Sequence, residues 1–503
     1  MTEHWMVFPI LIPLLSAMAC VLLGRDFLHV KRGLGLVGIL GTLATAAYML
    51  WTAQNGDVSV YQLGGWPIPY GIIFVVDRLS ATMVSLTAVL ALFAYLYALD
   101  GIDEDSPYFH FLFLMQITGV NGAFLTGDLF NLFVFFEILL LSAYVLVIYG
   151  GGAERAKAGL RYVFINLVGS ALFLISVGVI YGIAGTLNMA DLSVAMGQVS
   201  EENATLIRAA SYLLLVVFSV KAALFPLYFW LPKAYASATA PVAAIFAIMT
   251  KVGAYALLRS NTLFFGEGQG FVENLAHPIL LPIALVTLVL GVVGAMAADE
   301  LRLMGSYLLI ASVGTILAGF GLFNADGISG GLYYMVHSTL IMGAFFLIAD
   351  LIVEQRGPEH GGMLTQGPRV REPILVGMLF FVAAIALAGL PPLTGFLGKV
   401  LILEAAIDTE WTLILWATVL ATSFLMLLTI SRAGTALFWK TDEPREGDFD
   451  SARLRALPIV GLLACIVALV VFAGPVVEFM DATAAQVTTP SIYIESVLGE
   501  VSR

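Results

Sequence analysis

The chain has 503 residues, of which 60% are hydrophobic and only 12% are charged, and its mean hydropathy is +0.96. Soluble globular proteins carry roughly 25% charged residues. A larger core cannot explain the difference, because even large soluble domains need a polar surface. The composition therefore excludes soluble enzymes, nucleic-acid-binding proteins and secreted disulfide scaffolds, and it predicts a polytopic membrane protein.

Two cysteines, Cys20 and Cys465, lie in apolar stretches far apart in the sequence. This spacing gives no disulfide or metal framework, so both thiols are expected to pack in the core. The apolar stretch near 6–24 has no basic region before it and is followed by many more such stretches. It is expected to be the first membrane helix and not a cleaved signal peptide. No metal and no cofactor is expected.

Fourteen apolar stretches are long enough to cross the hydrocarbon core of a bilayer, which takes roughly 20 residues of helix. They lie near 5–24, 34–53, 72–99, 109–126, 129–149, 160–184, 207–229, 238–260, 276–297, 303–323, 328–353, 373–407, 411–436 and 456–478. The longest polar connections, near 185–206, 354–372 and 437–455, are too short to fold alone. The sequence therefore predicts an all-α membrane protein of about fourteen transmembrane helices.

The basic residues predict how these helices are oriented. Sixteen of them fall on one side: Arg25, Lys31, Arg32, Arg155, Lys157, Arg161, Lys233, Arg302, Arg356, Arg369, Arg371, Arg432, Lys440, Arg445, Arg453 and Arg455. Four fall on the other: Arg78, Arg208, Arg259 and Arg503. Because cytoplasmic loops are enriched in Lys and Arg, the first side is expected to be cytoplasmic and both termini are expected outside. The acidic loop Asp100–Asp105 is also expected in the cytoplasm, although it has no basic residue.

Four ionisable side chains interrupt the predicted spans: Glu137, Lys221, Lys251 and Lys399. A charge near the bilayer centre costs several kcal/mol, so such residues indicate a functional site. A buried glutamate–lysine pair that opens and closes changes its proton affinity with geometry, as a proton relay requires. The alternative is a structural ion pair between Glu137 and one lysine, with the other lysines reaching water-filled crevices.

Prolines are expected to break two of the helices that carry these lysines. Pro226 follows Lys221 by five residues, and Pro391 and Pro392 precede Lys399. Proline removes a backbone donor, and within lipid such a break needs neighbours or water to satisfy the freed carbonyls. Broken helices near the midplane are typical of transporters built from repeats.

His337 lies in another predicted span, GLYYMVHSTLIMGAFFLIAD. The ordinary pKa of histidine suits a proton carrier. The alternative is a core histidine hydrogen-bonded to a neighbour. The sequence has no P-loop, dinucleotide fingerprint, metal-ligand spacing or nucleophile elbow, so a gradient or a partner is expected to supply the energy.

At these residues the chain resembles the antiporter-like proteins shared by Mrp-type multi-subunit cation/proton antiporters and the proton-pumping arm of respiratory complex I. The matching stretches are FEILLLSAYVL, KAALFPLYFWLPKAYASATAPVAAI, MTKVGAYAL and GLPPLTGFLGK. The resemblance implies two inverted five-helix repeats, helices 4–8 and 9–13, with helices 7 and 12 broken. The implied divisions are 1–107 (helices 1–3), 108–262 (first repeat), 263–438 (second repeat) and 439–503 (a cytoplasmic loop, helix 14 and an outward-facing tail).

The resemblance also implies roles for individual residues. Glu137 and Lys221 would form an ion pair, with Lys251 as the central relay residue. His337 would bridge the two halves, and Lys399 would be the terminal site. The opening MVFPILIPLLSAMACVLLG, the length and the end of the chain about 25 residues after the last span are most similar to the D-type subunit of Mrp antiporters.

The leading hypothesis is a proton-translocating, non-enzymatic subunit of a multi-subunit Na⁺ (or K⁺)/H⁺ antiporter, driven by the proton motive force. Its expected partners are other hydrophobic subunits, including a larger antiporter-like subunit, in the lipid bilayer of a prokaryotic plasma membrane. Two alternatives stay open. One is a proton-pumping subunit of a complex I-type oxidoreductase or membrane-bound hydrogenase, and the other is a structural subunit with a vestigial relay. No nucleic acid is expected as a partner.

Overall fold

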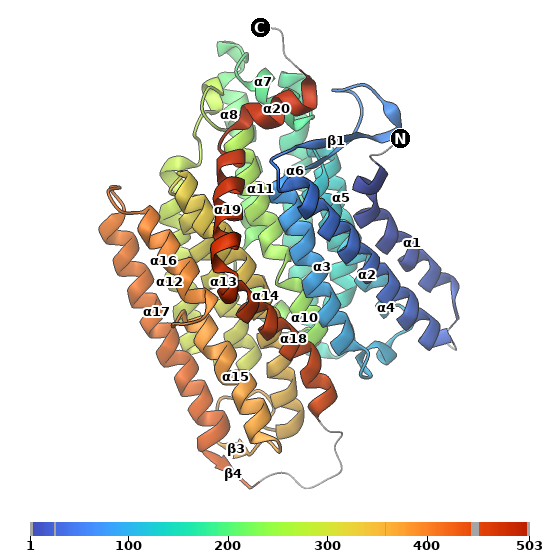
Figure 1. Ribbon diagram of the computed structural model, residues 1–503, viewed down its shortest axis with the longest axis vertical. Coiled ribbons are helices and arrows are strands. Elements are labelled where there is room, and N and C mark those ends of the chain that lie inside the picture. Colours follow the sequence, from blue (N-terminus) through green and yellow to red (C-terminus); the bar gives the residue numbers. More distant parts are fainter. Residues whose placement is uncertain (1–3, 25–26, 358, 444–451, 500–503) are drawn as a thin grey trace.

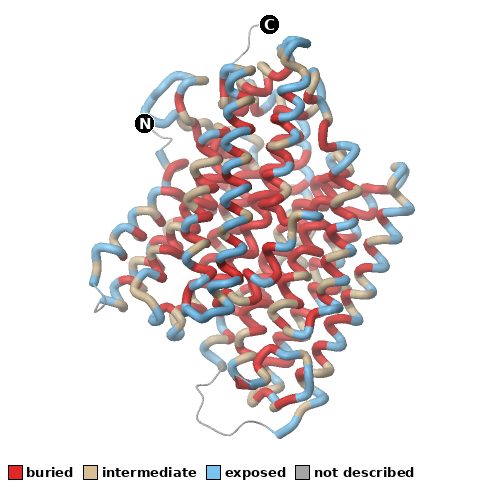
Figure 2. The backbone as a smooth tube through the Cα atoms, turned by 180° about the vertical axis from the view of Figure 1, so that it is seen from behind, coloured by how far each residue is buried: buried red, intermediate tan, exposed pale blue. Residues whose placement is uncertain are grey.

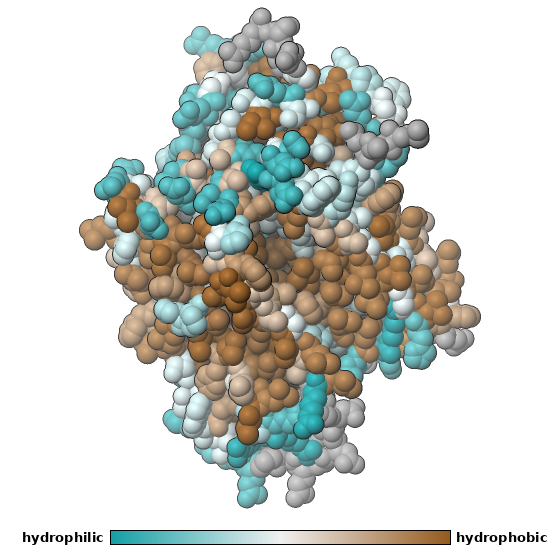
Figure 3. All heavy atoms as spheres, in the orientation of Figure 1, coloured by the Kyte–Doolittle hydropathy of each residue, from teal (hydrophilic) through white to brown (hydrophobic). Residues whose placement is uncertain are grey.

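A computed structural model describes residues 4–24, 27–357, 359–443 and 452–499. Among these residues, twelve helices are long and apolar enough to cross a membrane, and two further apolar helices, Phe109–Leu125 and Pro373–Ala388, are shorter. Figure 3 shows hydrophobic residues as a broad band across the middle of the visible face, with hydrophilic residues gathered towards the two ends. The chain is therefore a multi-pass membrane protein, as its composition predicts.

The elements follow one another as a series of helices that run back and forth along the long axis of the molecule (Figure 1). The helices up to residue 263 are α1 (Phe8–Leu22), α2 (Leu28–Ala53), α3 (Arg78–Ala98), α4 (Phe109–Leu125), α5 (Leu129–Val147), α6 (Ala153–Ala184), α7 (Met189–Met196), α8 (Ala204–Ala222), α9 (Leu231–Ser237), α10 (Ala240–Phe246) and α11 (Met249–Leu263). Those after it are α12 (His277–Ala297), α13 (Leu301–Phe320), α14 (Ala325–Arg356), α15 (Pro373–Ala388), α16 (Thr394–Ala405), α17 (Thr412–Gly434), α18 (Ala452–Val471), α19 (Ala473–Val487) and α20 (Pro490–Leu498).

Two small sheets lie at opposite ends of the molecule. Strand β1 (Ser59–Gln62) pairs antiparallel with β2 (Ile73–Val76), so that Ser59 lies opposite Val76. Strands β3 (Gly367–Pro368) and β4 (Thr441–Asp442) pair in parallel. The start of α1 and the helix α20 lie towards the end that holds β1, far from β3 and β4 (Figure 1).

The helices at the centre are buried on nearly every side. This holds for the span made by α10 and α11, for α13 and for α14, whereas α2, α17 and α18 bury only about a third of their most apolar stretch. Figure 2 shows the same contrast, with buried backbone concentrated in the middle and exposed backbone at the periphery. A helix that is apolar all round must be buried or face lipid. The central helices therefore hold their polar side chains away from lipid.

Two membrane helices are interrupted near prolines. Helix α8 ends at Ala222, Ala223 adopts a left-handed conformation with φ of 58°, and Pro226 lies in the irregular segment before α9. Left-handed residues commonly end helices, although a residue other than glycine adopts this conformation at a cost. Helix α15 ends in the same way at Ala388, followed by the left-handed Gly389 with φ of 76°, and Pro391 lies before α16 begins.

A third interruption has no proline to signal it. Helix α10 ends at Phe246 and α11 begins at Met249, two residues before Lys251. The apolar run continues across this point, so its periodicity predicts a single helix over 238–260. The break places Lys251 in the first turn of a helix and not in the middle of one.

Several element ends differ from the sequence prediction. Helices α2 and α6 begin at Leu28 and Ala153, earlier than predicted, because long basic side chains can extend from a helix to the polar boundary. Residues 73–76 form strand β2, and the predicted span there becomes helical only at Arg78, after Asp77 caps it by accepting from the Ser80 amide at 2.8 Å. The predicted connection near 185–206 contains α7, and the predicted tail after 478 is largely helical in α19 and α20.

The acidic loop 100–105 is neutralised by basic residues from neighbouring helices. Asp103 accepts two hydrogen bonds from Arg32, at 2.7 and 2.8 Å, and Asp100 pairs with Arg455. Both arginines belong to the basic side of the sequence count, so the loop lies on that side. Three other basic residues in the count, Arg25, Arg445 and Arg503, lie outside the described residues.

Candidate functional site

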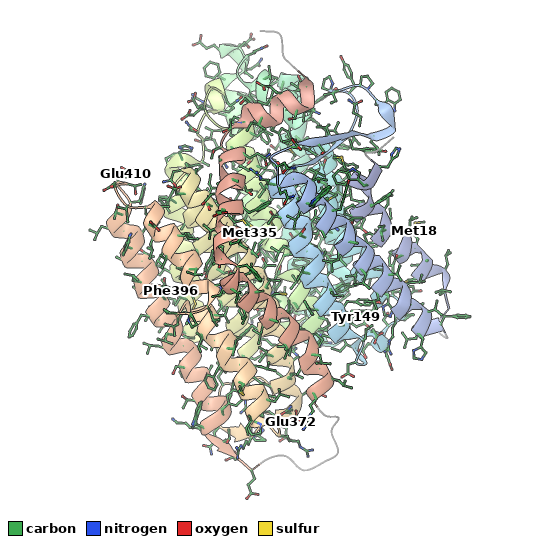
Figure 4. All side chains as sticks on the ribbon, viewed as in Figure 1. Met18, Tyr149, Met335, Glu372, Phe396 and Glu410 are labelled. Carbon is green, nitrogen blue, oxygen red and sulfur yellow. The ribbon has the colours of Figure 1, made fainter. Side chains whose placement is uncertain are left out.

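The five ionisable residues singled out in the sequence lie on five different helices. Glu137 is on α5, Lys221 on α8, Lys251 on α11, His337 on α14 and Lys399 on α16. The three lysines and the histidine are buried, and Glu137 is partly exposed. Figure 4 labels Met335, two residues before His337, and Phe396, three before Lys399, and both lie near the middle of the long axis.

Lys221 occupies the last turn of α8, where the helix dipole favours a positive charge. Its ammonium group donates to the amide oxygen of Asn166 on α6 at 3.1 Å. Glu137 is close enough for its charge to act on Lys221. Within the described ranges, however, Glu137 forms no ion pair, and its Oε1 is buried without a hydrogen-bond partner. The ion pair implied by the resemblance is therefore open in this structure and stays a prediction.

A small cavity adjoins Lys221 and reaches α11. Its lining includes Asn166, Tyr162, Lys221 and Val252, and its volume is about 10 Å³. Roughly 10–15 Å³ is the least that one water needs. The space beside this amine therefore suits at most one water molecule, and α11 itself packs directly against the end of α8, where a Cβ on Gly253 would lie 2.3 Å from the amide nitrogen of Ala222.

Lys251 has no hydrogen-bond partner in the part of the chain that the structure describes. Its Nζ is fully buried. Leaving a buried donor unpaired costs about 1–3 kcal/mol, and more for a charged group. An unpaired buried ammonium group therefore destabilises the fold. The same surroundings suit an amine that is protonated only transiently.

His337 and Lys399 are held by the second broken helix. His337 Nδ1 lies 2.7 Å from the hydroxyl of Thr394, the first residue of α16. Lys399 donates to the carbonyl of Ala388, at the broken end of α15, at 3.1 Å and to Ser423 on α17 at 2.9 Å. The break thus frees a backbone carbonyl, which the lysine then satisfies.

The charges of Lys251 and Lys399 both act on His337. By these electrostatic interactions the five residues fall into two groups, Glu137 with Lys221, and Lys251 and Lys399 with His337, and the small cavity beside Lys221 reaches α11 at Val252.

Sequence reasoning missed three polar partners: Asn166, Thr394 and Ser423. Each is a small uncharged residue in an apolar stretch, and the sequence contains many like them. Only the distances to Lys221, His337 and Lys399 distinguish these three.

A buried ion pair towards the end of α11 was also missed. Arg259, one of the four basic residues on the less basic side, lies inside the predicted span 238–260 and inside α11, and it contacts the carboxylate of Asp77 at 2.6 Å. Its guanidinium also lies over the ring of Tyr255, 5.4 Å from the centroid. Lys251, Tyr255 and Arg259 follow one another at intervals of four and share one face of the helix, a spacing that is visible in the sequence.

Comparison with known proteins shows the family of the chain. Residues 126–425 match the family described as NADH:quinone oxidoreductase/Mrp antiporter, TM. The probable D-type subunit of a K⁺/H⁺ antiporter from Rhizobium meliloti is 37% identical over 99% of this chain and 98% of its own length. The D-type subunit of a Na⁺/H⁺ antiporter from Alkalihalophilus pseudofirmus is 36% identical over 99% of this chain and 100% of its own.

A solved structure shows the same fold. A chain of the Mrp complex from a Dietzia species superposes with a TM-score of 0.89 at 27% identity, covering 99% of this chain and 100% of that one. The fold and the buried ionisable residues define a multi-pass membrane protein of the antiporter-like class. The chain belongs to the family of D-type subunits of Mrp-type cation/proton antiporters. Members of this family are named as transporter components and not as enzymes.

Proposed function

We propose that this chain conducts protons as the D-type subunit of a multi-subunit Na⁺ (or K⁺)/H⁺ antiporter, through Glu137, Lys221, Lys251, His337 and Lys399. The observation that carries the proposal is the placement of five buried or half-buried ionisable side chains on five helices of one membrane protein, with charges that act on one another. Charged groups at membrane depth are expensive and typically mark ion pathways. A single structural ion pair would not need three lysines.

The fold that we propose has fourteen crossings. Twelve crossings are the long spans. Helix α4 makes a thirteenth, and α15 together with α16 makes a fourteenth. Glu372, just before α15, and Glu410, just after α16, lie towards opposite ends of the molecule (Figure 4), which supports counting the two short helices as one crossing.

Two inverted repeats account for the position of the breaks. The first repeat, within 108–262, comprises α4, α5, α6, α8 with α9, and α10 with α11. The second, within 263–438, comprises α12, α13, α14, α15 with α16, and α17. The proline-associated break falls in the fourth crossing of each unit. An odd number of crossings gives two such units opposite orientations, which is how many transporters are built. Residues 1–107 and 439–503 would flank the repeats.

The proposed mechanism uses the chain's own side chains in sequence. A proton enters near Glu137, passes to Lys221 when the open pair closes, and crosses to Lys251. It then reaches His337 and leaves through Lys399. Each proton that moves inward releases about 2.3 kcal/mol per 100 mV of membrane potential, which is available to export a cation. Few carboxylates lie at membrane depth, so we place the cation site at least partly in partner subunits, including a larger antiporter-like one.

We further propose that the chain resides in a prokaryotic plasma membrane with both termini outside. The sixteen basic residues on one side, against four on the other, support this orientation. The pairing of the acidic loop with Arg32 and Arg455 adds to it, because that loop then belongs to the basic side.

Everted membrane vesicles from an antiporter-deficient host test the function. The chain is expressed with its partner genes, respiration builds a pH gradient, and a fluorescent probe reports its collapse on addition of Na⁺ or K⁺. We expect collapse with the natural chain and none with Glu137→Gln, although the variant complex still assembles. Full exchange by Glu137→Gln would contradict the proposed relay. A complex that ignores cations but acidifies vesicles during quinone reduction would be a redox-driven pump instead.

A further inference from the structure

A second polar cavity lies apart from the line of buried ionisable residues. It has a volume of about 470 Å³ and lies between the first turns of α6, the short helix α9 and the start of α13. Its basic lining residues are Arg155, Lys157, Arg161, Lys233 and Arg302. Its acidic ones are Glu154 and Glu300. The lining therefore carries an excess of three positive charges, or of two when Arg302 is counted with Asp350, its partner outside the cavity.

The cavity lies towards one end of the membrane-spanning region and not at its middle. Arg155 is fixed there because its Nε donates to the carbonyl of Ser237 at 2.7 Å and its Nη1 to the carbonyl of Tyr149 at 3.1 Å. Figure 4 shows Tyr149 nearer than Met335 to the end that holds β3 and β4. The lining comes from the first turns of α6, the short helix α9 and the start of α13, where the chain enters or leaves its membrane helices on the basic side, and we place lipid headgroups at that level.

Much of the positive charge in this cavity is not neutralised by the protein. Among the described residues, Lys157, Arg161 and Lys233 have no ion-pair partner, and the Nε of Arg302 is buried without a hydrogen bond. Lys157 also lies in the opening turns of α6, where the helix dipole disfavours cations. The positive-inside rule explains which side of the membrane these residues occupy, but not why three helices bring them to one cavity.

An apolar face leads away from the cavity along α6. Leu160, Phe164 and Leu167 are 71%, 64% and 58% exposed. With spacings of four and three residues, they continue the helix face that begins with Lys157. A molecule with an anionic head in the cavity and long apolar chains would match both parts of this surface.

We propose that this cavity binds the phosphate group of an anionic phospholipid, whose acyl chains lie along the apolar face of α6. The guanidinium group of arginine and the ammonium group of lysine are the usual phosphate ligands. The backbone amides at the start of a helix also favour an anion. Basic pockets between membrane helices bind anionic headgroups in the same way. The volume falls within the range of small-molecule sites, roughly 300–1,000 Å³.

The two carboxylates do not prevent such binding. Burial raises the pKa of Glu300, Arg302 opposes this effect, and Asp299 reinforces it, so that the pKa is raised overall. A carboxyl with a raised pKa repels an anion less than an ordinary one. Glu154 is exposed at the start of α6, as are the cations Lys157, Arg161 and Lys233, so all four side chains are free to turn, the carboxylate towards water and the cations towards a phosphate.

Native mass spectrometry of the purified antiporter complex, titrated with phosphatidylglycerol or with phosphatidylcholine, tests the site. We expect one phosphatidylglycerol to bind much more tightly than phosphatidylcholine. The double variant Arg161→Ala/Lys233→Ala should weaken this binding about 25-fold, or about five-fold for each lost cation. The charge-conserving pair Arg161→Lys/Lys233→Arg should largely retain it. Lys440→Ala, an exposed cation on the same side but outside the cavity, is the matched control and should bind as the natural chain does.

Three results would overturn the proposal. The first is equal binding of phosphatidylglycerol by the double variant and the natural complex. The second is displacement of the lipid by millimolar inorganic phosphate, which would make the cavity a site for a soluble anion. The third is a natural complex that binds no anionic lipid here because a partner subunit fills the cavity. Co-purification of the partner subunits with each variant shows that folding is intact.

Discussion

The three buried lysines differ in how their amines are satisfied. Lys221 has one acceptor, the amide oxygen of Asn166, and Lys399 has two, a freed carbonyl and Ser423. Lys251 has none in the part of the chain that the structure describes. Because an unpaired buried donor is costly, the charged form is least supported at Lys251. In the relay that we propose, a proton would therefore rest near Lys221 or Lys399 and only pass through Lys251.

The first prediction concerns Asn166. Substitution Asn166→Leu keeps the branched shape of the side chain but removes the acceptor of Lys221, which leaves a buried ammonium group unpaired at a cost of about 1–3 kcal/mol. We expect cation-dependent proton exchange to slow by about ten-fold in reconstituted liposomes, since about 1.4 kcal/mol corresponds to a factor of ten.

Ser176→Ala is the matched control for this variant. Ser176 also lies on α6, is buried, and donates to a backbone carbonyl of α8, that of Ala210, at 2.7 Å. It lies far from Lys221 along the helix, so exchange should stay near normal. Equal slowing by both variants would mean that packing of α6 on α8 matters and that the lysine contact does not.

The broken helices depend on close backbone packing. A Cβ on Gly253 of α11 would lie 2.3 Å from the amide nitrogen of Ala222 and 2.6 Å from the carbonyl carbon of Lys221. A Cβ on Gly395 of α16 would lie 2.1 Å from the carbonyl oxygen of Ala386. Each broken end is thus set against a neighbouring helix with no room for a side chain, which fixes the position of the nearby lysine.

The second prediction follows from the packing of Gly253. Gly253→Ala must push α11 away from α8, because both obstructing atoms are backbone. Overpacking of this kind costs about 1–3 kcal/mol, so we expect a lower thermal unfolding temperature and a loss of exchange. Gly178→Ala on α6 meets no atom within 4 Å and should leave both unchanged. A normal Gly253→Ala variant would show that the α8–α11 contact is loose.

Sequence patterns predict some of these elements better than others. The prolines at 226, 391 and 392 carry a direct steric signal, and irregular segments lie at each of them. The break between Phe246 and Met249 has no such signal, since the residues around it are apolar and compatible with a helix. On its two sides the chain packs against different neighbours, α10 against α3 and α14 and α11 chiefly against α8, and no local pattern encodes these contacts. The sequence cannot predict a single buried hydrogen-bond partner such as Asn166 for the same reason, because the pairing depends on which helices are neighbours.

At the scale of the whole molecule, ion pairs join helices on the basic side. Asp103 accepts from Arg32 and lies 3.3 Å from His110 Nε2, and Arg455 of α18 pairs with Asp100 and Glu354. Arg302 pairs with Asp350, which also accepts from Tyr97 at 2.9 Å. The sequence predicts the side of the membrane for these residues but not their partners, because pairing depends on which helices are neighbours.

The third prediction uses the pH dependence of the Asp103 cluster. Burial acts to raise the pKa of Asp103, but the nearby ring of His110 and the hydrogen bonds from Arg32 outweigh it and lower the pKa below 3.8. A carboxyl with a lowered folded-state pKa stabilises the fold above its unfolded pKa, and this contribution is lost as the pH falls through the folded value. Asp103→Asn should therefore destabilise the protein at pH 7 by about 3 kcal/mol, and its difference from the natural chain should shrink below about pH 4.

Thermal unfolding in detergent between pH 3 and pH 7 measures this effect. Glu104→Gln is the control, because Glu104 also contacts Arg32, at 3.0 Å, but its side chain is 58% exposed. Exposed pairs contribute only about 0–1 kcal/mol, so this variant should unfold almost normally. Equal destabilisation by both variants, or a difference at Asp103 that is independent of pH, would contradict the assignment.

In the proposed relay every proton passes through Lys251, and the substitution Lys251→Met tests that most directly. The substitution keeps the length of the side chain and removes its charge. The measurement is the initial rate of Na⁺- or K⁺-driven proton movement by the purified complex in liposomes, with Ser260→Ala on the same helix as control. Ser260 donates only to a carbonyl of its own helix, that of Leu257, at 3.1 Å. We predict exchange at the background level for Lys251→Met and near-normal exchange for Ser260→Ala. Normal exchange by an assembled Lys251→Met complex would contradict the relay.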